Sequence, residues 1–314
     1  MLKCLIMGGS YFIGKAVLET LKDHKTCYVL NRGTRSIDDQ DVIHLKSDRK
    51  DIDSMKKLLN TYTFDYVVDI SGYDVNDVDI LLDSLNLESL KTYVFISTAA
   101  VYDITKGKTP YKETSALGSN PPYHIYGNNK IEAEMRLKQR LNKEQLVIFR
   151  PPYVYGPYNY VLRERMMFYV IDKDLPLYIP LSRNYIQFVY VYDLALDILK
   201  ALEGVIPFGI YNVGSKEAMT FYEWVSLIEK AIGKKARLTF VNDELYHTKP
   251  TDYFPFLSRD VHVDVTKIKS YFSHQTDIIK GLEQAYIDYK KVKEEIKIPD
   301  KVLDTWMKLN LLLG

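Results

Sequence analysis

Short apolar runs alternate with longer stretches whose apolar residues recur every three or four positions, up to about Phe149. Runs of four to six apolar residues are typical of buried strands, whereas the longer spacing is typical of helices packed on one face. The expected strands are Leu2–Met7, Cys27–Leu30, Val42–Leu45, Tyr66–Ile70, Tyr93–Ser97 and Leu146–Phe149. The expected helices between them are Lys15–Leu21, Ile52–Leu59, Asp77–Leu85 and Tyr126–Leu141. Such alternation predicts an α/β fold with a doubly wound parallel sheet.

The pattern changes after Pro151, where helices are separated by short strand segments and proline-containing loops. The helices expected there are Leu162–Ile171, Tyr192–Leu202, Phe221–Ile232, Ile278–Lys293 and Asp300–Leu312. We therefore assign residues 1–150 to the sheet and residues 151–314 mainly to a smaller lobe that is interleaved with it. The turn-rich segment Pro110–Pro122 is a candidate loop over a functional site.

Composition narrows the class of protein. A chain of 314 residues can form a full-sized core, and its net charge of +1 gives no global attraction to nucleic acid or to a membrane. Cys4 and Cys27 fall in expected strands, so we expect buried thiols and a reducing, cytoplasmic location. We see no apolar stretch long enough for a membrane span. The six histidines show no metal-ligand spacing, so no metal is expected.

A glycine-rich turn joins the first expected strand to the first expected helix. Strand, tight turn and helix N-terminus together form a pyrophosphate-binding unit, because the first N–H groups of a helix are free to bind an anion. Tyr11 replaces the middle glycine of a G-x-x-G-x-x-G pattern, so its side chain must point away from the pyrophosphate. An ordinary strand–helix turn is the alternative. The candidate cofactor residues are Gly8, Gly9, Ser10, Tyr11, Phe12, Ile13 and Gly14.

The end of the second expected strand carries Asn31 and Arg32 in place of an acidic residue. An acid at this position binds the ribose hydroxyls of NAD, whereas an amide with nearby Arg32 and Arg35 accommodates the 2′-phosphate of NADP. We therefore predict NADP as the cofactor and keep NAD as the alternative. Solvated loop arginines would give the same pattern.

Tyr126 and Lys130 lie four residues apart, on one face of an expected helix. The lysine ammonium can lower the pKa of the tyrosine, so that the phenol exchanges a proton with a substrate hydroxyl. Thr98 follows the fifth strand at a suitable distance along the sequence. A solvated Tyr–Lys pair and a threonine that caps its own backbone are the alternatives.

Together, Gly8–Gly14, Thr98, Tyr126, Lys130 and the segment Arg150–Pro157 resemble the extended short-chain dehydrogenases/reductases, the NAD(P)-dependent epimerase/dehydratase family. Within it, the chain is similar to a divergent branch that includes the chloroplast stem-loop RNA-binding proteins. The resemblance implies a Rossmann-type fold with a C-terminal substrate-binding lobe. It places Thr98 rather than Ser97 at the catalytic hydroxyl.

The same resemblance assigns the remaining site residues. Lys130 would also hold the nicotinamide ribose. Asp48 and Arg49 follow the third strand, where the family contacts adenine. The strand end Ile70, Ser71 and Gly72 would let the cofactor approach closely, and Tyr153 would line the nicotinamide pocket.

Two classes of function remain open. The first is an NADP-linked enzyme acting on a sugar or nucleotide-sugar hydroxyl or carbonyl, as an epimerase, a dehydratase or a reductase. The resemblance implies that enzymes acting on nucleotide sugars carry an arginine two residues before the aromatic residue of this strand, where it binds the diphosphate. No arginine stands at Tyr185–Ile186, and Arg183 is out of register, which argues against nucleotide diphosphate binding. The second is a non-catalytic or RNA-associated protein that keeps the fold, against which the near-neutral charge speaks.

A homodimer is a further expectation. A second apolar stripe of Ile131, Met135 and Leu141 on the Tyr126 helix could pair across a two-fold axis, or could pack on the chain's own sheet.

Overall fold

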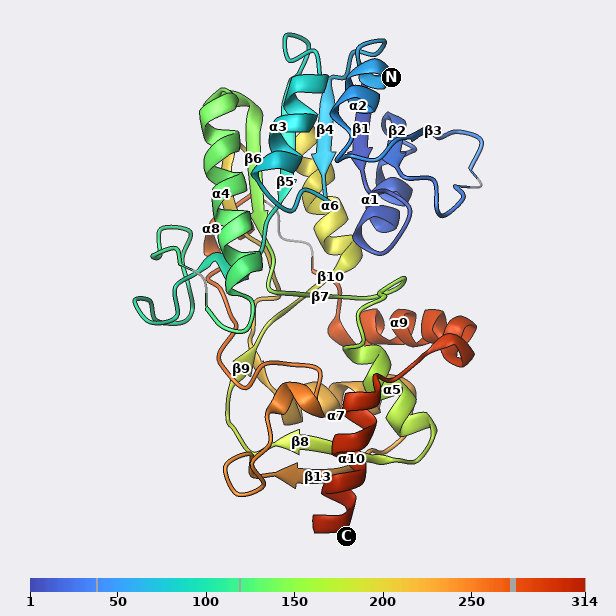
Figure 1. Cartoon of the computed structure of the whole chain (residues 1–314), viewed down its shortest axis with the longest axis vertical. Coiled ribbons are helices and arrows are strands. Elements are labelled where there is room, and N and C mark those ends of the chain that lie inside the picture. The colour runs from blue at the N-terminus through green and yellow to red at the C-terminus, as the bar shows by residue number, and fades with distance from the viewer. Residues whose placement is uncertain (38, 119, 272–274, 314) are drawn as a thin grey trace.

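A computed structural model describes residues 1–37, 39–118, 120–271 and 275–313. Seven strands form one parallel sheet in the order β11-β6-β5-β4-β1-β2-β3 (Figure 1). Their bounds are β1 Lys3–Met7, β2 Thr26–Asn31, β3 Ile43–Lys46, β4 Tyr66–Asp69, β5 Thr92–Ile96, β6 Leu146–Arg150 and β11 Gly209–Asn212. The predicted doubly wound parallel sheet is confirmed, and each of the six expected strands is present to within one or two residues.

Helices cover both faces of the sheet because its strands are apolar on both faces. On β1, Cys4 and Ile6 face one cluster of the core, whereas Leu5 and Met7 face the other. The second cluster packs under three helices, α2 Ile52–Leu59, α3 Val75–Ser84 and α4 His124–Arg140. The first packs under α1 Ile13–Leu21 and α6 Val191–Leu202, which contact each other.

Most of the chain after Pro151 forms a second lobe, which occupies the lower half of Figure 1. It contains the parallel strand pair β8 and β13. Elsewhere in this lobe, Phe188 stacks on Trp224 at a centroid distance of 3.6 Å. The bounds are β7 Tyr153–Tyr155, α5 Glu164–Asp172, β8 Pro176–Pro180, β9 Tyr185–Ile186, β10 Phe188–Tyr190, β12 Met219–Thr220, α7 Phe221–Ile232, β13 Arg237–Val241, α8 Thr266–Lys269, α9 Ile278–Val292 and α10 Asp300–Leu313.

The chain returns to the sheet after it has begun the second lobe. Helix α6 covers one face of the sheet, and β11 pairs with β6 as an edge strand. This seventh strand was not expected from the sequence. The two lobes are therefore interleaved.

Cys4 and Cys27 are register partners on β1 and β2, and both are buried free thiols, as expected. Leu141 follows the second of the two alternatives for the apolar stripe, because it is buried in the chain's own core. Met135 is 53% exposed and Ile131 is partly buried. The homodimer stays a prediction. Across the part of the chain that the structure describes, no helix has both the length and the apolar character needed to cross a membrane.

Candidate active site

The turn between β1 and α1 has the tight geometry that its glycines require. Gly8 has a φ of +92°, and a Cβ on Gly14 would lie 2.1 Å from the Gly8 carbonyl oxygen. Phe12, at the start of α1, also has a positive φ of 44° although it is not glycine. Such a backbone conformation is unfavourable for a bulky residue and is found mainly where function requires it. The cradle at this helix N-terminus has the shape that a pyrophosphate needs.

Tyr11 lies in the wall of a cavity beside this turn. Its ring centroid is 5.4 Å from that of Tyr160, and the Arg35 guanidinium lies 3.9 Å from its centre. The ring therefore connects the arginine loop after β2 with the loop that precedes α5. Gly9 lies elsewhere, packed on β2, where a Cβ would meet Val29 at 2.9 Å.

Asn31 ends β2 and is held by two hydrogen bonds to its side-chain oxygen. Gly33 N donates to Oδ1 at 2.7 Å and His44 Nε2 at 2.9 Å. Its Nδ2 is buried and has no hydrogen-bond partner among the described residues. A buried donor without an acceptor is unfavourable, so this amide fits an oxygen of a bound cofactor. Arg32 and Arg35 are both exposed at the same loop.

Arg49 differs from the role expected for it at the adenine. Its guanidinium is bound to Asp69 at 2.9 Å and to Asp77 at 3.2 Å, and it donates to the Ser71 hydroxyl at 2.8 Å. Burial alone would raise the pKa of Asp69, but the charge and hydrogen bonds of Arg49 lower it. Arg49 therefore connects the end of β4 to α3. Asp48 is exposed.

The end of β4 approaches the cavity closely. Ile70 and Ser71 line it, and a Cβ on Gly72 would lie 2.5 Å from Asp69 Oδ2. Gly72 also offers its carbonyl oxygen to Lys130 Nζ at 2.5 Å. A side chain at this position would collide with the Asp69 carboxylate, which explains the glycine.

Thr98, Tyr126 and Lys130 meet in a cavity of about 800 Å³ beside the glycine-rich turn. The Tyr126 hydroxyl lies close enough to Thr98 for that residue to lower its pKa, although burial raises the pKa overall. Thr98 Oγ1 also accepts from Ala100 N at 3.1 Å, so its backbone-capping role is present as well. Lys130 Nζ donates to the carbonyl oxygens of Gly72 and Ile96, and one of its three N–H groups remains for a ligand. Tyr153 lies in the same wall.

The electrostatics differ from the expected Tyr–Lys coupling. Burial raises the pKa of Tyr126, and the neighbouring Thr98 and the charge of Arg163 partly offset this rise. The cation with the largest effect on Tyr126 is therefore Arg163 and not Lys130. Burial also lowers the pKa of Lys130 to about 8, against the attraction of Asp69.

A buried polar network below the cavity was missed in the sequence. Ser97 Oγ donates to Glu134 Oε1 at 2.6 Å, and Glu134 forms a two-point ion pair with Arg150. Arg150 reaches Tyr102, whose hydroxyl donates to Asn212 of β11 at 2.6 Å. Glu134 lies one turn beyond Lys130 on α4, so a charged residue on that buried face was an available signal.

The second lobe completes the cavity wall with residues that sequence reasoning also missed. Arg163 precedes α5, whereas Arg259, Asp260 and His262 come from the segment before α8. No local pattern connects them to Tyr126. Arg183 is exposed and does not line the cavity.

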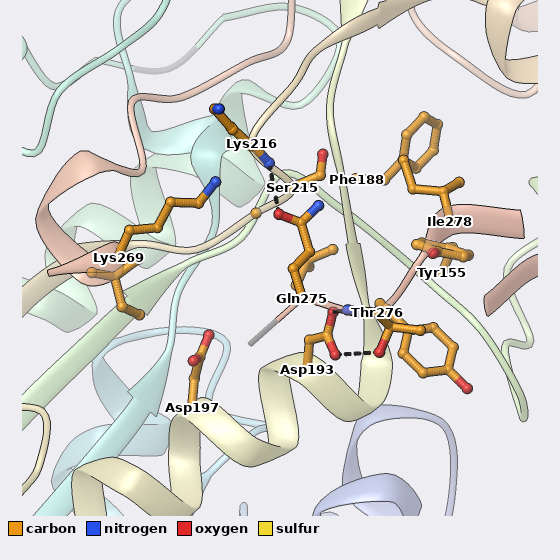
Figure 2. Close-up of a pocket in the computed structure, with 14 residues that line it drawn as sticks. Tyr155, Phe188, Asp193, Asp197, Ser215, Lys216, Lys269, Gln275, Thr276 and Ile278 are labelled. Atoms are coloured by element: carbon orange, nitrogen blue, oxygen red, sulfur yellow. Dashed lines mark hydrogen bonds between the residues drawn. The ribbon is translucent and has the colours of Figure 1, made fainter. Parts of the chain in front are cut away.

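A separate cavity of about 360 Å³ is lined by residues of β10, α6 and α8 and by residues 214–216 and 275–276. Figure 2 shows the carboxylates of Asp193 and Asp197 rising from α6 into it. Asp193 accepts hydrogen bonds from Thr276, whereas Lys216 and Lys269 line another part of the wall. Among the described residues, no group of three or more His, Cys, Asp or Glu is placed to hold a metal ion here or elsewhere.

Comparisons with known proteins agree with this geometry. The model of the NAD dependent epimerase/dehydratase family matches residues 4–214. A chloroplast stem-loop binding protein of 41 kDa from Arabidopsis thaliana is 30% identical over 311 residues, which cover 90% of this chain and 78% of that protein.

Solved structures share the fold at low sequence identity. UDP-glucose 4-epimerase from Thermotoga maritima superposes with a TM-score of 0.77 at 18% identity, covering 93% of this chain and 100% of that one. The dTDP-glucose 4,6-dehydratase of Bacillus anthracis, solved with NAD, gives a TM-score of 0.73 at 19% identity, over 94% and 98% of the two chains. From its family model and its Arabidopsis relative, the chain belongs to the NAD dependent epimerase/dehydratase family.

Proposed function

We propose that the protein is an NADP-linked enzyme that transfers a hydride between its cofactor and a carbon bearing a hydroxyl or carbonyl group in a sugar-like substrate. The observation that carries this proposal is that Thr98, Tyr126 and Lys130, the last one turn beyond Tyr126 on α4, line one cavity beside the glycine-rich turn. Structural neighbours that act on nucleotide sugars support the substrate class.

Each polar group of the cavity has a role in that reaction. Tyr126 exchanges the proton of the substrate hydroxyl as general acid/base. Thr98 donates to the same oxygen and orients it, because its hydroxyl can donate and accept at once. The free N–H of Lys130 binds a ribose hydroxyl beside the nicotinamide, which when bound supplies or accepts the hydride. Tyr153 and Tyr73 enclose the site and exclude water.

Cofactor preference gives the first test. An acid is replaced here by Asn31, whose Nδ2 has no hydrogen-bond partner among the described residues, and by the exposed Arg32 and Arg35. We therefore expect NADPH to bind at least about tenfold more tightly than NADH. Titration calorimetry measures both affinities. Arg32→Ala should weaken NADPH and leave NADH nearly unchanged, whereas the exposed Arg183→Ala should change neither. Equal affinity for the two cofactors would contradict the assignment.

Turnover is tested with a panel of carbonyl and nucleotide-sugar substrates, monitored by NADPH absorbance. Activity on at least one sugar, lost in Tyr126→Phe, is the expected result. Tight NADPH binding without turnover on any member of the panel would leave the protein a cofactor-binding protein and refute the enzymatic proposal.

A second candidate function is RNA binding, which the name of the Arabidopsis relative favours. With a net charge of +1, binding to phosphates should be weak and should fall steeply with salt. A gel-shift assay with a stem-loop RNA at about 150 mM salt, close to physiological ionic strength, tests it. Submicromolar binding that Tyr126→Phe leaves intact would support RNA binding as an independent activity.

A further inference from the structure

The catalytic cavity concentrates positive charge. Its described lining residues include three cationic side chains, Lys130, Arg163 and Arg259, against one carboxylate, Asp260. The whole chain has a net charge of only +1. An excess of two positive charges in one cavity is therefore a local feature, and low-dielectric walls strengthen its field.

Arg163 lies beside Tyr153 in the wall of this cavity. Its guanidinium carbon lies 4.7 Å from the centre of the Tyr153 ring, and its charge lowers the pKa of Tyr126. Across the described part of the chain, no carboxylate forms an ion pair with Arg163. The neighbouring Glu164 is instead turned inward, where Asn159 Nδ2 donates to it at 2.9 Å.

Arg259 approaches the same ring from the second lobe. Arg259, Arg163 and Tyr153 line the same cavity, and the charges of both arginines lower the pKa of Tyr153, although burial raises it overall. Arg259 donates one N–H to the Pro121 carbonyl at 2.9 Å, and its Nε is buried without a partner among the described residues. Among the described residues no ion pair joins Asp260 to Arg259, and the Asp260 carboxylate accepts hydrogen bonds from Tyr185 N at 2.8 Å and from Thr109.

We propose that the substrate is an acidic sugar, whose carboxylate or phosphate is held between Arg163 and Arg259 while Tyr126 acts on a nearby hydroxyl. This inference rests on the proposed function and names its substrate class. A guanidinium presents two parallel N–H groups that match a carboxylate or a phosphate, and a partly buried guanidinium without an anion is unfavourable.

The cofactor does not account for these two arginines. Its 2′-phosphate is expected at Arg32 and Arg35, which do not line the cavity. Its pyrophosphate is expected at the glycine-rich turn, which lines the cavity but is a different part of the wall from Arg163 and Arg259. A neutral sugar would leave both guanidinium groups without an anion.

The test uses the full chain saturated with NADP and three matched sugars. Galacturonate supplies a carboxylate, galactose 6-phosphate a phosphate, and galactose neither. Saturation-transfer NMR and calorimetry measure binding into the millimolar range. We expect at least one acidic sugar to bind about 10- to 100-fold more tightly than galactose, with an affinity that falls as salt is raised.

Variants then locate the anion site. Arg163→Gln and Arg259→Gln should each remove most of the preference for the acidic sugar, and Arg163→Lys should restore part of it. The exposed Arg183→Gln is the control and should have no effect. NADPH affinity and the melting temperature should remain near those of the parent protein, which separates this result from a folding defect.

Four results would overturn the inference. Three of them are galactose binding as tightly as the acidic sugars, absence of binding by any of the three, and retention of the preference in both glutamine variants. Binding of UDP that is lost in both variants would also overturn it, because the arginines would then recognise a nucleotide diphosphate. Failure of the parent protein to bind NADPH would count against the proposed function itself and not against this site.

Discussion

At the scale of single residues, the Tyr126 hydroxyl is the group on which the proposed chemistry depends. Tyr126→Phe removes the proton donor and keeps a ring of the same size in the cavity. We expect turnover to fall by about 10²–10⁴ with NADPH affinity largely unchanged. Steady-state kinetics and calorimetry measure the two effects. Tyr62→Phe, in a stacked pair with Phe64 and outside the cavity lining, is the control, and full activity in Tyr126→Phe would refute the role.

Ser97 and Thr98 are adjacent hydroxyl residues with different surroundings. Ser97 donates a hydrogen bond to the buried Glu134, whereas Thr98 lines the cavity with Tyr126. We expect Ser97→Ala to lower the free energy of unfolding by about 1–3 kcal/mol, since a buried carboxylate loses a donor. Thr98→Val should instead reduce turnover with little loss of stability, and Thr98→Ser should be nearly silent. Urea unfolding and kinetics, measured on all three variants, distinguish the roles; a reversed pattern would assign catalysis to Ser97.

Asp197 gives the protein a stability that depends on pH. Burial, followed by the charge of Asp193, raises its pKa to about 8, so the folded protein keeps this proton while the unfolded chain loses it near pH 4. The unfolding free energy should therefore decrease as pH rises from about 4 to about 8. Asp197 faces Asp193 on its own helix, with Lys216 and Lys269 elsewhere in the wall (Figure 2).

Asp197→Asn removes that titration. We expect the variant to gain stability over the parent progressively above pH 4, reaching a few kcal/mol near pH 9. Thermal unfolding across this range measures the difference. The exposed Asp174→Asn serves as control, and a difference that does not change with pH would contradict the raised pKa.

The residues that sequence could identify are those defined by local spacing. Tyr126 and Lys130 share a helix face, and Gly8 and Gly14 belong to one turn. Arg49 was placed correctly after β3 but its partners Asp69 and Asp77 come from another strand and helix. Arg163 and Arg259 are separated by 96 positions, and nothing local shows that they line one cavity.

At the scale of elements, boundaries were predicted best where capping is encoded locally. Helices α2 and α7 begin and end at the expected residues, because Asp51 and Thr220 cap their N-termini and Gly233 ends α7 in a left-handed conformation. Strand β11 was missed because Gly209–Asn212 is short and carries no apolar run. Its place in the sheet comes from pairing with β6, a contact distant in sequence.

The Glu134–Arg150 ion pair fastens α4 to β6, and both side chains are almost fully buried. Glu134→Gln leaves the guanidinium without its counter-ion, so we expect a loss of about 3–5 kcal/mol in unfolding free energy. Arg150→Met should cost a similar amount, and the double variant should lose clearly less than the sum. Guanidinium unfolding of the three variants gives the coupling energy.

The surface pair Lys200–Glu203 provides the control, because both side chains are about one-third exposed. Glu203→Gln should change stability by less than about 0.5 kcal/mol. Additive losses in the double variant of the buried pair would show that the two side chains stabilise the fold independently.

At the scale of the whole molecule, the cavity exists because the two lobes meet over the ends of the strands. One wall comes from the glycine-rich turn, β4 and α4, and the other from Arg163 and the segment that leads into α8. The class of fold was predictable from alternating strands and helices. The shape and charge of the cavity were not, since both depend on loops that approach each other only in the folded chain.

The returning strand also has a consequence for the protein during its synthesis. Residues 1–150 contain six of the seven strands of the sheet, yet Leu146–Arg150 lacks its outer neighbour until residues 209–212 have been made. Helix α6, which covers one face, is also made late. At about 5–20 residues per second, the ribosome needs roughly 3–12 seconds for these 62 residues. Throughout that interval the nascent chain carries an uncovered apolar face and an open strand edge, the kind of surface that chaperones bind.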